Sequence, residues 1–360
     1  MTKISRRGFM QSAAAVSTLP LLGATKALAQ EPLKVGFIYL GPIGDFGWTW
    51  AHEKGRKAMV EALGGAIEAN YVENVKEDAS ALPVLRDLAQ QGHKLIFATS
   101  YGFMEQSVQL AAEFPDVKVE HCTGYKRADN LSTYNSRFHE GRAVLGTIAG
   151  MMSKTGVIGY LGSFKVPEVV LGVNSFALAA QAVNPNIKVK LIMIDSWFDP
   201  AKEAAATETL ANLGCDVITA HTDSPACLQI CEQKGLFGFG QGADMSQFAP
   251  TAHLTAIEDI WGPYYTRRAQ AVLDGTWKSE DTWDGMKEGG VVISPYNAAM
   301  PQEVKDAADK IQAGWKDGSY NVFTGPIKDQ SGTEKVAAGV VMPLSDLAVI
   351  DWFVNGVEGA

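Results

Sequence analysis

The stretch KVGFIYLGPIGDFGWTWAHEKG, residues 34–55, decides the fold class of this 360-residue chain. It begins with an apolar run over residues 35–40, which has the length of a buried β-strand. Glycines follow at every third position, at 41, 44 and 47, and a helical pattern then runs from about residue 51 to 63. A strand, a glycine-containing loop and a helix form the first unit of an α/β fold.

The loop within this stretch places an acid and aromatic side chains at the end of the strand. Ligands of open parallel sheets bind outside the carboxyl ends of the strands. The spacing G-x-x-G-x-x-G differs from the G-x-G-x-x-G that lets a backbone approach a pyrophosphate, which disfavours a dinucleotide site. We instead expect Trp48 to stack on a flat ligand, with Asp45 and Phe46 beside it. Such stacking is worth about 1–3 kcal/mol per base.

Apolar β-rich runs alternate with helical patterns along most of the chain, which predicts parallel sheets covered by helices on both faces. The expected strands are residues 34–40, 66–72, 94–99, 117–121, 157–161, 187–194, 216–220, 236–240, 253–257 and 291–293. The expected helices are residues 51–63, 80–91, 103–114, 139–153, 168–183, 200–213, 225–234, 262–274 and 301–314. The pattern repeats in two blocks, 33–150 and 155–250, and we expect loop from about residue 315 onward.

The first 29 residues have the pattern of an export signal. SRRGFM, residues 5–10, contains a twin arginine, and an apolar stretch of small residues leads to an A-x-A cleavage pattern at residues 27–29. A membrane anchor fits less well, because the apolar stretch is short and carries Lys26. The sequence therefore predicts a twin-arginine signal peptide and a mature, periplasmic chain of about 330 residues, which is long enough for two lobes.

Charge and motifs exclude several classes of function. The net charge is −9, with acids and bases interspersed, so a nucleic-acid surface is not expected. Cys122, Cys215, Cys227 and Cys231 leave one disulfide or unpaired buried thiols equally open, and none has zinc-site spacing. The chain lacks G-x-S-x-G, H-E-x-x-H and P-loop motifs. We therefore expect a protein that is not an enzyme, with no catalytic residues, no metal and no cofactor.

Aromatic and hydrogen-bonding residues follow other predicted strands as well. Because carboxyl ends of parallel strands meet at one edge of a sheet, these loops predict a cleft between two lobes. The residues expected at this cleft, beyond the first loop, are Tyr101, Gly102, Trp197, Phe198, Asp223, Gly240 and Asp244.

These segments together resemble a known family. The matching stretches are residues 44–49 and on through 55, then 138–141, 146–150, 155–159, 184–185, 197–200, 214–218 and 237–240, in this order along the mature chain. The chain resembles the basic membrane protein (BMP) family of ABC-transporter substrate-binding proteins, which includes purine nucleoside receptors.

The resemblance implies a type I periplasmic-binding-protein fold, with two Rossmann-like lobes and a hinge of several segments. We expect an N-terminal lobe of residues 30–150 plus about 252–285, and a C-terminal lobe of residues 151–251 plus about 286–360. The family's stacking aromatic falls on Trp48, and the aromatic covering the opposite face falls on Trp197 or Phe198. The Asp45 position also lies at the ligand in the family.

Two departures from the family bear on the ligand. Nucleoside-binding members carry acids after the strand that matches residues 237–239, whereas this chain has Gly240, Gln241, Gly242 and Ala243, and its acid Asp244 comes late. A family lysine is replaced by residues 258 and 259, both acids. A site that lacks partners for sugar hydroxyls loses discrimination for the sugar. These departures favour a free purine base such as adenine over a nucleoside.

The expected partners are a purine base or nucleoside and an ABC permease in the inner membrane, and we expect a monomer. An exported oxidoreductase with a nucleotide cofactor is an alternative, because twin-arginine export carries folded, cofactor-loaded proteins. A sugar-binding protein of the same fold is another, because aromatic faces also stack on sugar rings. An amino-acid site would want an arginine for the carboxylate, and the predicted loops contain none.

Overall fold

The computed structural model describes residues 31–359, and the predicted signal peptide lies outside these residues. The strands are β1 (Leu33–Ile38), β2 (Ile67–Val72), β3 (Leu95–Ala98), β4 (Lys118–Cys122), β5 (Leu131–Ser136), β6 (Val157–Gly162), β7 (Lys188–Met193), β8 (Val217–His221), β9 (Phe237–Gly242), β10 (His253–Asp259), β11 (Asp281–Asp284), β12 (Val291–Ile293), β13 (Ile327–Lys328), β14 (Glu334–Val336) and β15 (Val357–Glu358).

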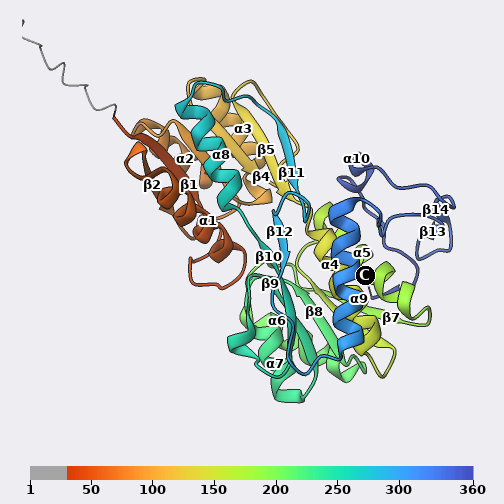
Figure 1. The fold of residues 1–360 in the computed structure, drawn as a ribbon. Helices are drawn as coiled ribbons and strands as arrows, with labels where there is room; N and C mark the ends of the chain where they lie inside the picture. Colours follow the sequence, from red (N-terminus) through yellow and green to blue (C-terminus); the bar gives the residue numbers. More distant parts are fainter. Residues whose placement is uncertain (1–30, 360) are drawn as a thin grey trace, which may run out of the picture. The chain divides into compact units, whose positions relative to one another are not determined.

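The helices alternate with these strands (Figure 1). They are α1 (Trp48–Leu63), α2 (Ala81–Gln90), α3 (Met104–Glu113), α4 (Phe138–Met152), α5 (Pro167–Val183), α6 (Pro200–Asn212), α7 (Ala226–Lys234), α8 (Gly262–Leu273), α9 (Gln302–Asp317) and α10 (Leu344–Leu347). Every strand and helix expected from the sequence is present. The strands β5 and β11 and the short elements after residue 317 were not expected.

Two sheets organise the described residues. The first has the order β11-β5-β4-β3-β1-β2, and all its pairings are parallel. The second has the order β12-β10-β9-β8-β6-β7-β15 and is parallel except for β12, which runs antiparallel to β10. In both sheets the order of strands reverses beside the first strand of the unit, at β1/β3 and at β6/β8. Ligands of such sheets bind at this switch point.

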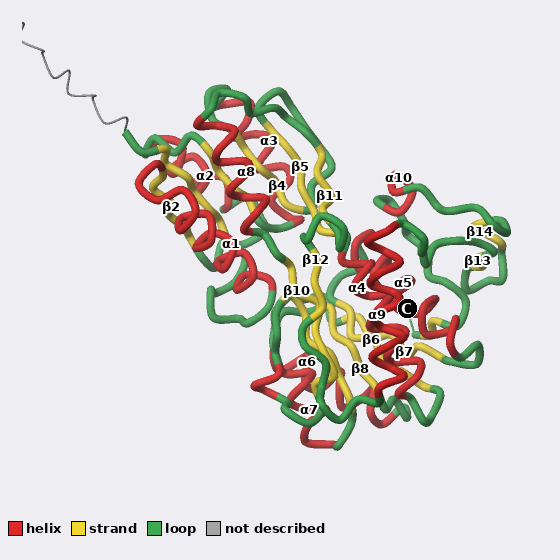
Figure 2. Tube along the Cα trace, in the orientation of Figure 1, coloured by secondary structure: helices red, strands yellow, loops and turns green. Residues whose placement is uncertain are grey.

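Helices cover both faces of each sheet, as Figure 2 shows. In the first sheet, α2 and α3 bury one apolar cluster, and α1 packs with α8 over another. In the second sheet, α6 and α7 enclose one cluster, and α4, α5 and α9 enclose the largest one. We call the first sheet with its helices the N-terminal lobe, and the second with its helices the C-terminal lobe. The doubly wound architecture predicted from the alternation is confirmed.

Within residues 31–359 the chain crosses between the sheets at three places, which are β5 to α4, β10 to α8 and β11 to β12. The observed lobes differ from the predicted boundaries at two elements. Helix α4 was expected in the N-terminal lobe, but it is buried along nearly its whole length between α5 and α9. Strand β10 was also expected there, but it pairs with β9 and β12. Residues after 317 were expected to be loop, yet β15 extends the second sheet beside β7.

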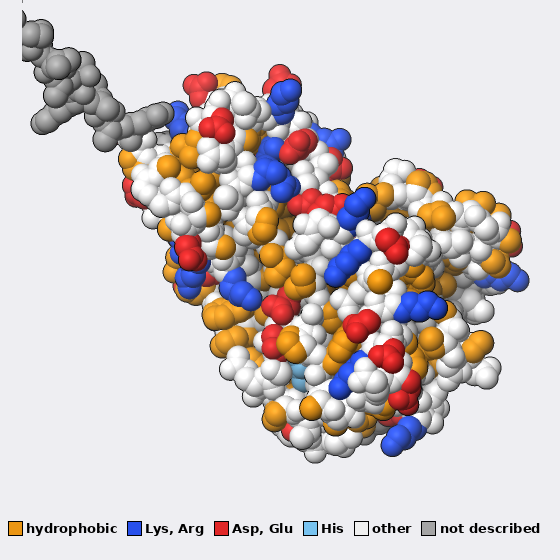
Figure 3. Space-filling model, viewed as in Figure 1, with side chains coloured by type: hydrophobic (Ala, Val, Ile, Leu, Met, Phe, Trp, Pro, Cys, Tyr) orange, Lys and Arg blue, Asp and Glu red, His pale blue; other side chains and the backbone are white. Residues whose placement is uncertain are grey.

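The surface charge and the cysteines bear on two questions that the sequence raised, namely whether the chain binds nucleic acid and whether it forms a disulfide. Figure 3 shows acidic and basic side chains interspersed over the visible face, with no field of a single sign. All four cysteines are free and buried, which answers the question that the sequence left open.

Candidate ligand-binding site

A small cavity of about 20 Å³ lies between the two lobes, where the carboxyl ends of both sheets meet. This space holds about one water molecule, so an aromatic ligand can enter only if the lobes or the lining side chains move apart. The cavity is lined by Leu40, Trp48, Ser100, Tyr101, Thr123, Glu168, Trp197, His221, Asp223 and Gln241. The structure thus brings together four of the predicted residues, Trp48, Tyr101, Trp197 and Asp223.

Trp48 is the first residue of α1 and enters the cavity from the N-terminal lobe. Its indole Nε1 donates a hydrogen bond to the Thr99 carbonyl at 2.6 Å. His52 and Trp261 pack edge-to-face against the indole, with ring centroids 4.6 and 5.6 Å away. The ring is therefore held at one edge and one side.

Trp197 enters the same cavity from the C-terminal lobe, in the loop after β7. Its Nε1 donates to Glu77 Oε2 at 3.1 Å, so this bond joins the two lobes. Phe198, the other candidate for this position, is 39% exposed and borders a separate groove with Phe46. Trp197 and Phe198 therefore point to different sides of the loop, and Trp197 is the one that lines the same cavity as Trp48.

Glu77 was not predicted, although it organises the N-terminal side of the site. Its Oε1 accepts hydrogen bonds from Ser100 Oγ at 2.5 Å and from the Gly102 backbone N–H at 2.7 Å. A Cβ at Gly102 would lie 2.7 Å from the Glu77 carboxyl carbon, so only glycine leaves room for this contact. Gly102 therefore supports the site from behind and does not line the cavity.

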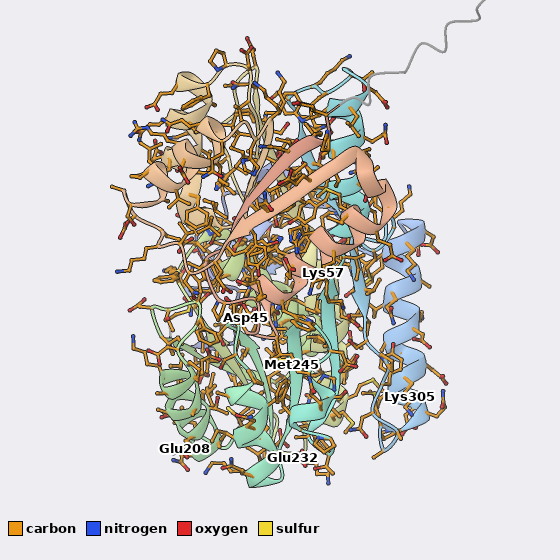
Figure 4. The ribbon with its side chains drawn as sticks, turned by 90° about the vertical axis from the view of Figure 1, so that its left-hand side faces the viewer. Asp45, Lys57, Glu208, Glu232, Met245 and Lys305 are labelled. Atoms are coloured by element: carbon orange, nitrogen blue, oxygen red, sulfur yellow. The ribbon has the colours of Figure 1, made fainter. Side chains whose placement is uncertain are left out.

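Asp45 is buried in the loop before α1, where this loop meets the C-terminal lobe (Figure 4). Its carboxylate accepts hydrogen bonds from the backbone N–H groups of Gly47, Thr49 and Trp50, each at 2.9 Å. Thr49 and Trp50 lie in the first turn of α1, whose N–H groups have no partner inside the helix. Asp45 is not among the residues that line the cavity, and its oxygens are occupied by the helix start.

Phe46 also serves the junction of the lobes and not the cavity. Its φ of +63° is in the left-handed region, which is rare for a bulky residue. Its ring packs edge-to-face on Phe248 of the C-terminal lobe, with centroids 4.9 Å apart.

Two acids of the cavity lack compensating cations. Within residues 31–359 the Asp223 carboxyl has no hydrogen-bond partner, and burial together with neighbouring acids raises its pKa well above the usual range. Glu168 is partly exposed as a residue, but its Oε2 is buried without a described partner. Burial, with Glu77 and Asp259 nearby, raises the pKa of Glu168 to about 8. Such groups both donate and accept hydrogen bonds when protonated.

The remaining predicted residues lie near the cavity without lining it. Gly240 is inside β9, where a Cβ would lie 2.7 Å from Ala256 Cβ. Asp244 is exposed and accepts a hydrogen bond from the Ser246 N–H at 2.8 Å. The neighbour of Gly240, Gln241, lines the cavity in their place.

Gln241 and Glu168 line the cavity, and the sequence prediction missed both of them. Side chains alternate between the faces of a strand, so the residue next to Gly240 was the one to consider. Glu168 follows the predicted strand 157–161 at the same edge of the sheet, so the rule that identified the other loops also applies to it.

A wider groove of about 350 Å³ adjoins the cavity and shares Tyr101, Thr123 and Glu168 with it. Its walls come from both lobes, with Trp283 on one side and Leu171 on the other. Among residues 31–359, His, Cys, Asp and Glu form no group of three that could hold a metal ion.

Comparisons with known proteins agree with this geometry. Residues 33–317 match the model of a family described as ABC transporter substrate-binding protein PnrA-like (Bmp). A purine-binding protein of Brucella abortus (strain 2308) is 54% identical over 332 residues, which cover 92% of this chain and 95% of that protein. A Haloferax volcanii protein, named as a candidate glucose-binding protein of an ABC transporter, is 31% identical over 91% of this chain and 81% of its own length.

Solved structures identify the fold. A solute-binding protein of an ABC transporter from Conexibacter woesei has a TM-score of 0.66 at 19% identity, and the match covers 80% of this chain and 98% of that one. The two lobes and the cavity between their strand ends define a substrate-binding protein of the type I periplasmic-binding-protein fold. The chain belongs to the Bmp family of PnrA-like ABC transporter substrate-binding proteins.

Family membership settles several questions that the sequence raised. The family consists of substrate-binding proteins and not of enzymes, so the alternative of an exported oxidoreductase is set aside. Proteins of this kind work outside the cytoplasmic membrane, take a small-molecule ligand and deliver it to a permease. No helix in the described part of the chain has both the length and the apolar character that a membrane span requires.

Proposed function

We propose that this chain is the periplasmic solute-binding component of an ABC importer for purines, and that it prefers a free base such as adenine. The observation that carries the proposal is that Trp48 and Trp197 line one cavity from opposite lobes. Two indoles at one small site suit a flat aromatic ring, and each stacked face contributes about 1–3 kcal/mol. The name of the Brucella relative, which gives purines as its ligand, supports the same class.

The polar groups of the cavity fit the edge of a purine. Adenine alternates N–H donors with unprotonated ring nitrogens, so its partners must both accept and donate. Asp223 and Glu168, with raised pKa values, can hold a proton and serve in either role. The amide of Gln241 adds donors at the same cavity.

The preference for a base over a nucleoside rests on the strand end at β9. Gly240 carries no side chain there, and Asp244 points to solvent, so neither supplies a carboxylate for ribose hydroxyls. Sugar hydroxyls that enter a site without partners lose their hydrogen bonds to water at a net cost.

Calorimetry of the mature protein with adenine, hypoxanthine, adenosine, inosine and glucose tests the proposal. We expect the bases to bind most tightly. A nucleoside that binds roughly tenfold or more tightly than its base, a gap of about 1.4 kcal/mol, contradicts the base preference. Binding of glucose without any purine contradicts purine transport and favours the activity named for the Haloferax relative.

The route of export is a separate part of the proposal. We expect a twin-arginine signal at residues 1–29, with Arg6 and Arg7 as its central pair. Replacing both arginines by lysine is expected to keep the chain in the cytoplasm, as measured by cell fractionation. Unchanged export of this variant contradicts a twin-arginine route.

A further inference from the structure

Arg142 is a buried cation directly behind the cavity. It lies on α4, is 0% exposed, and donates from Nη1 to Thr219 Oγ1 at 2.9 Å and from Nη2 to Gln241 Oε1. Its guanidinium carbon also sits 5.2 Å from the ring centroid of Tyr160. A buried arginine with these contacts has one position, since its fork of donors is planar and rigid.

The contact with Arg142 fixes the orientation of the Gln241 amide. An amide can usually be turned over, which exchanges its oxygen and nitrogen. Arginine, however, has only donors, so the amide atom that meets it must be the oxygen. The Nε2 group is therefore on the other side, and it has no acceptor among residues 31–359 although Gln241 lines the cavity.

We propose that Gln241 determines ligand specificity as a fixed hydrogen-bond donor, with Arg142 as the positioning residue that holds its amide. This inference rests on the proposed purine function. The ligand edge that meets β9 must then carry an unprotonated ring nitrogen or a carbonyl oxygen. A ligand with an N–H or C–H at that place leaves a buried donor unpaired, which costs more than the bond itself contributes.

A series of adenine analogues tests this inference on the unaltered protein. In 1-deaza-, 3-deaza- and 7-deazaadenine, one ring nitrogen is replaced by C–H, so each lacks one acceptor while keeping the flat ring. We expect one of the three to bind roughly tenfold or more weakly than adenine in calorimetry, because it faces Gln241. If all three bind within roughly threefold of adenine, no ring acceptor is recognised and the inference is wrong.

The variant Gln241→Glu assigns the effect to this residue. Glutamate has nearly the same shape and keeps an acceptor for Arg142, but it has no N–H to offer the ligand. We expect adenine to bind roughly tenfold more weakly, and the discriminated analogue to bind as well as adenine. A variant that keeps the same preference among analogues contradicts the role of Gln241.

The positioning role of Arg142 has its own readout. Arg142→Met has similar length without donors, so the Gln241 amide can turn over and present its oxygen. The penalty for the discriminated analogue is then expected to shrink, whereas an unchanged penalty contradicts the role of Arg142. Thermal unfolding of each variant verifies that it is folded. If a variant does not fold, the analogue series measured on the unaltered protein still tests the inference. If adenine itself does not bind the unaltered protein, the proposed purine function is wrong. If adenine binds but the three deaza analogues bind equally well, the purine function stands and only the inference about Gln241 is wrong.

Discussion

Trp48 is the cavity residue that we expect to contribute most to binding. Its indole is fixed by Thr99 on one edge and by aromatic neighbours on one side, so little conformational freedom is lost when a ligand stacks on it. We predict that Trp48→Ala weakens purine binding by about 1–3 kcal/mol, measured by calorimetry. The matched control is Trp352→Ala. Trp352 is half-buried like Trp48, but it does not line the cavity. Equal affinities for both variants would remove Trp48 from the site.

Asp45 illustrates how one residue can be located by sequence while its role is not. From the sequence it is expected beside the ligand, but its oxygens accept three backbone N–H groups at the start of α1. The cap residue of this helix is Gly47, which has no side chain that could accept hydrogen bonds from the first turn. We therefore propose that Asp45 supplies the cap from two residues earlier.

The proposed capping role predicts a change in stability. Asp45→Ala is expected to lower the free energy of unfolding by about 1–2 kcal/mol, the usual cost of a lost cap, measured by urea denaturation. Asp45→Asn, which keeps one acceptor oxygen, is expected to recover part of this loss. A variant that keeps its unfolding free energy but binds the ligand weakly would return Asp45 to the role of a ligand anchor.

At the scale of elements, β5 shows what the sequence could not reveal. Its residues LSTYNS are mostly polar, yet all six are buried. Ser132 Oγ accepts a hydrogen bond from Arg268 Nη2 at 2.8 Å, and Thr133 Oγ1 donates to Asp281 at 2.7 Å. These partners lie more than 130 residues along the chain. Apolar periodicity predicts strands that are buried by the hydrophobic effect, whereas a strand satisfied by distant polar partners has no local signal.

The loop between β1 and α1 touches the C-terminal lobe at Gly47. A Cβ at this position would lie 2.8 Å from the Cα of Asp223, whereas a Cβ at Gly44 in the same loop would meet no atom within 4 Å. We expect closure of the lobes on a ligand to depend on this close approach, since a ligand favours the closed state only as far as it binds that state more tightly. Glycine is thus required at position 47, because the C-terminal lobe leaves no room for a side chain there. Position 44 has room for a side chain.

This difference gives a prediction with a control in the same loop. Gly47→Ala is expected to lower ligand affinity by roughly tenfold, and to reduce the ligand-induced compaction seen by small-angle X-ray scattering. Gly44→Ala is expected to behave like the unaltered protein in both measurements. Equal compaction in the two variants would show that the lobes do not approach at Gly47 when ligand is bound.

For the molecule as a whole, the sequence predicted the architecture and the edge of the sheets at which the cavity lies, but not all the side chains that face it. Alternation of strands and helices specifies two doubly wound sheets, and parallel strands place their ends together. Whether Trp197 or Phe198, and whether Gly240 or Gln241, faces the cavity depends on how each loop turns and on the register of β9. Those details are set by contacts between the lobes, such as the bond from Trp197 to Glu77, which no local pattern encodes.

The buried acids also predict how stability depends on pH. Burial raises the pKa of Glu168 to about 8 and that of Asp259 to about 7, compared with about 4 for exposed carboxyls. At pH values between the pKa of the unfolded state and that of the folded state, the folded state binds more protons than the unfolded state. The free energy of unfolding therefore decreases as pH rises through this range and levels off above the pKa of the folded state. Buried histidines with lowered pKa values, such as His139 at about 3, act in the opposite direction only below about pH 6.5.

We therefore predict that the free energy of unfolding decreases between about pH 6.5 and pH 8, each acid contributing up to about 1.4 kcal/mol per pH unit below its folded pKa. Glu168→Gln keeps the shape of the side chain and removes its titration, so the slope is expected to become shallower. The exposed Glu208 on α6, labelled in Figure 4, gives the surface control Glu208→Gln. Urea denaturation at a series of pH values measures the three slopes. If the slope for Glu168→Gln equals that of the unaltered protein, the Glu168 carboxyl is ionised at neutral pH and offers the ligand no proton.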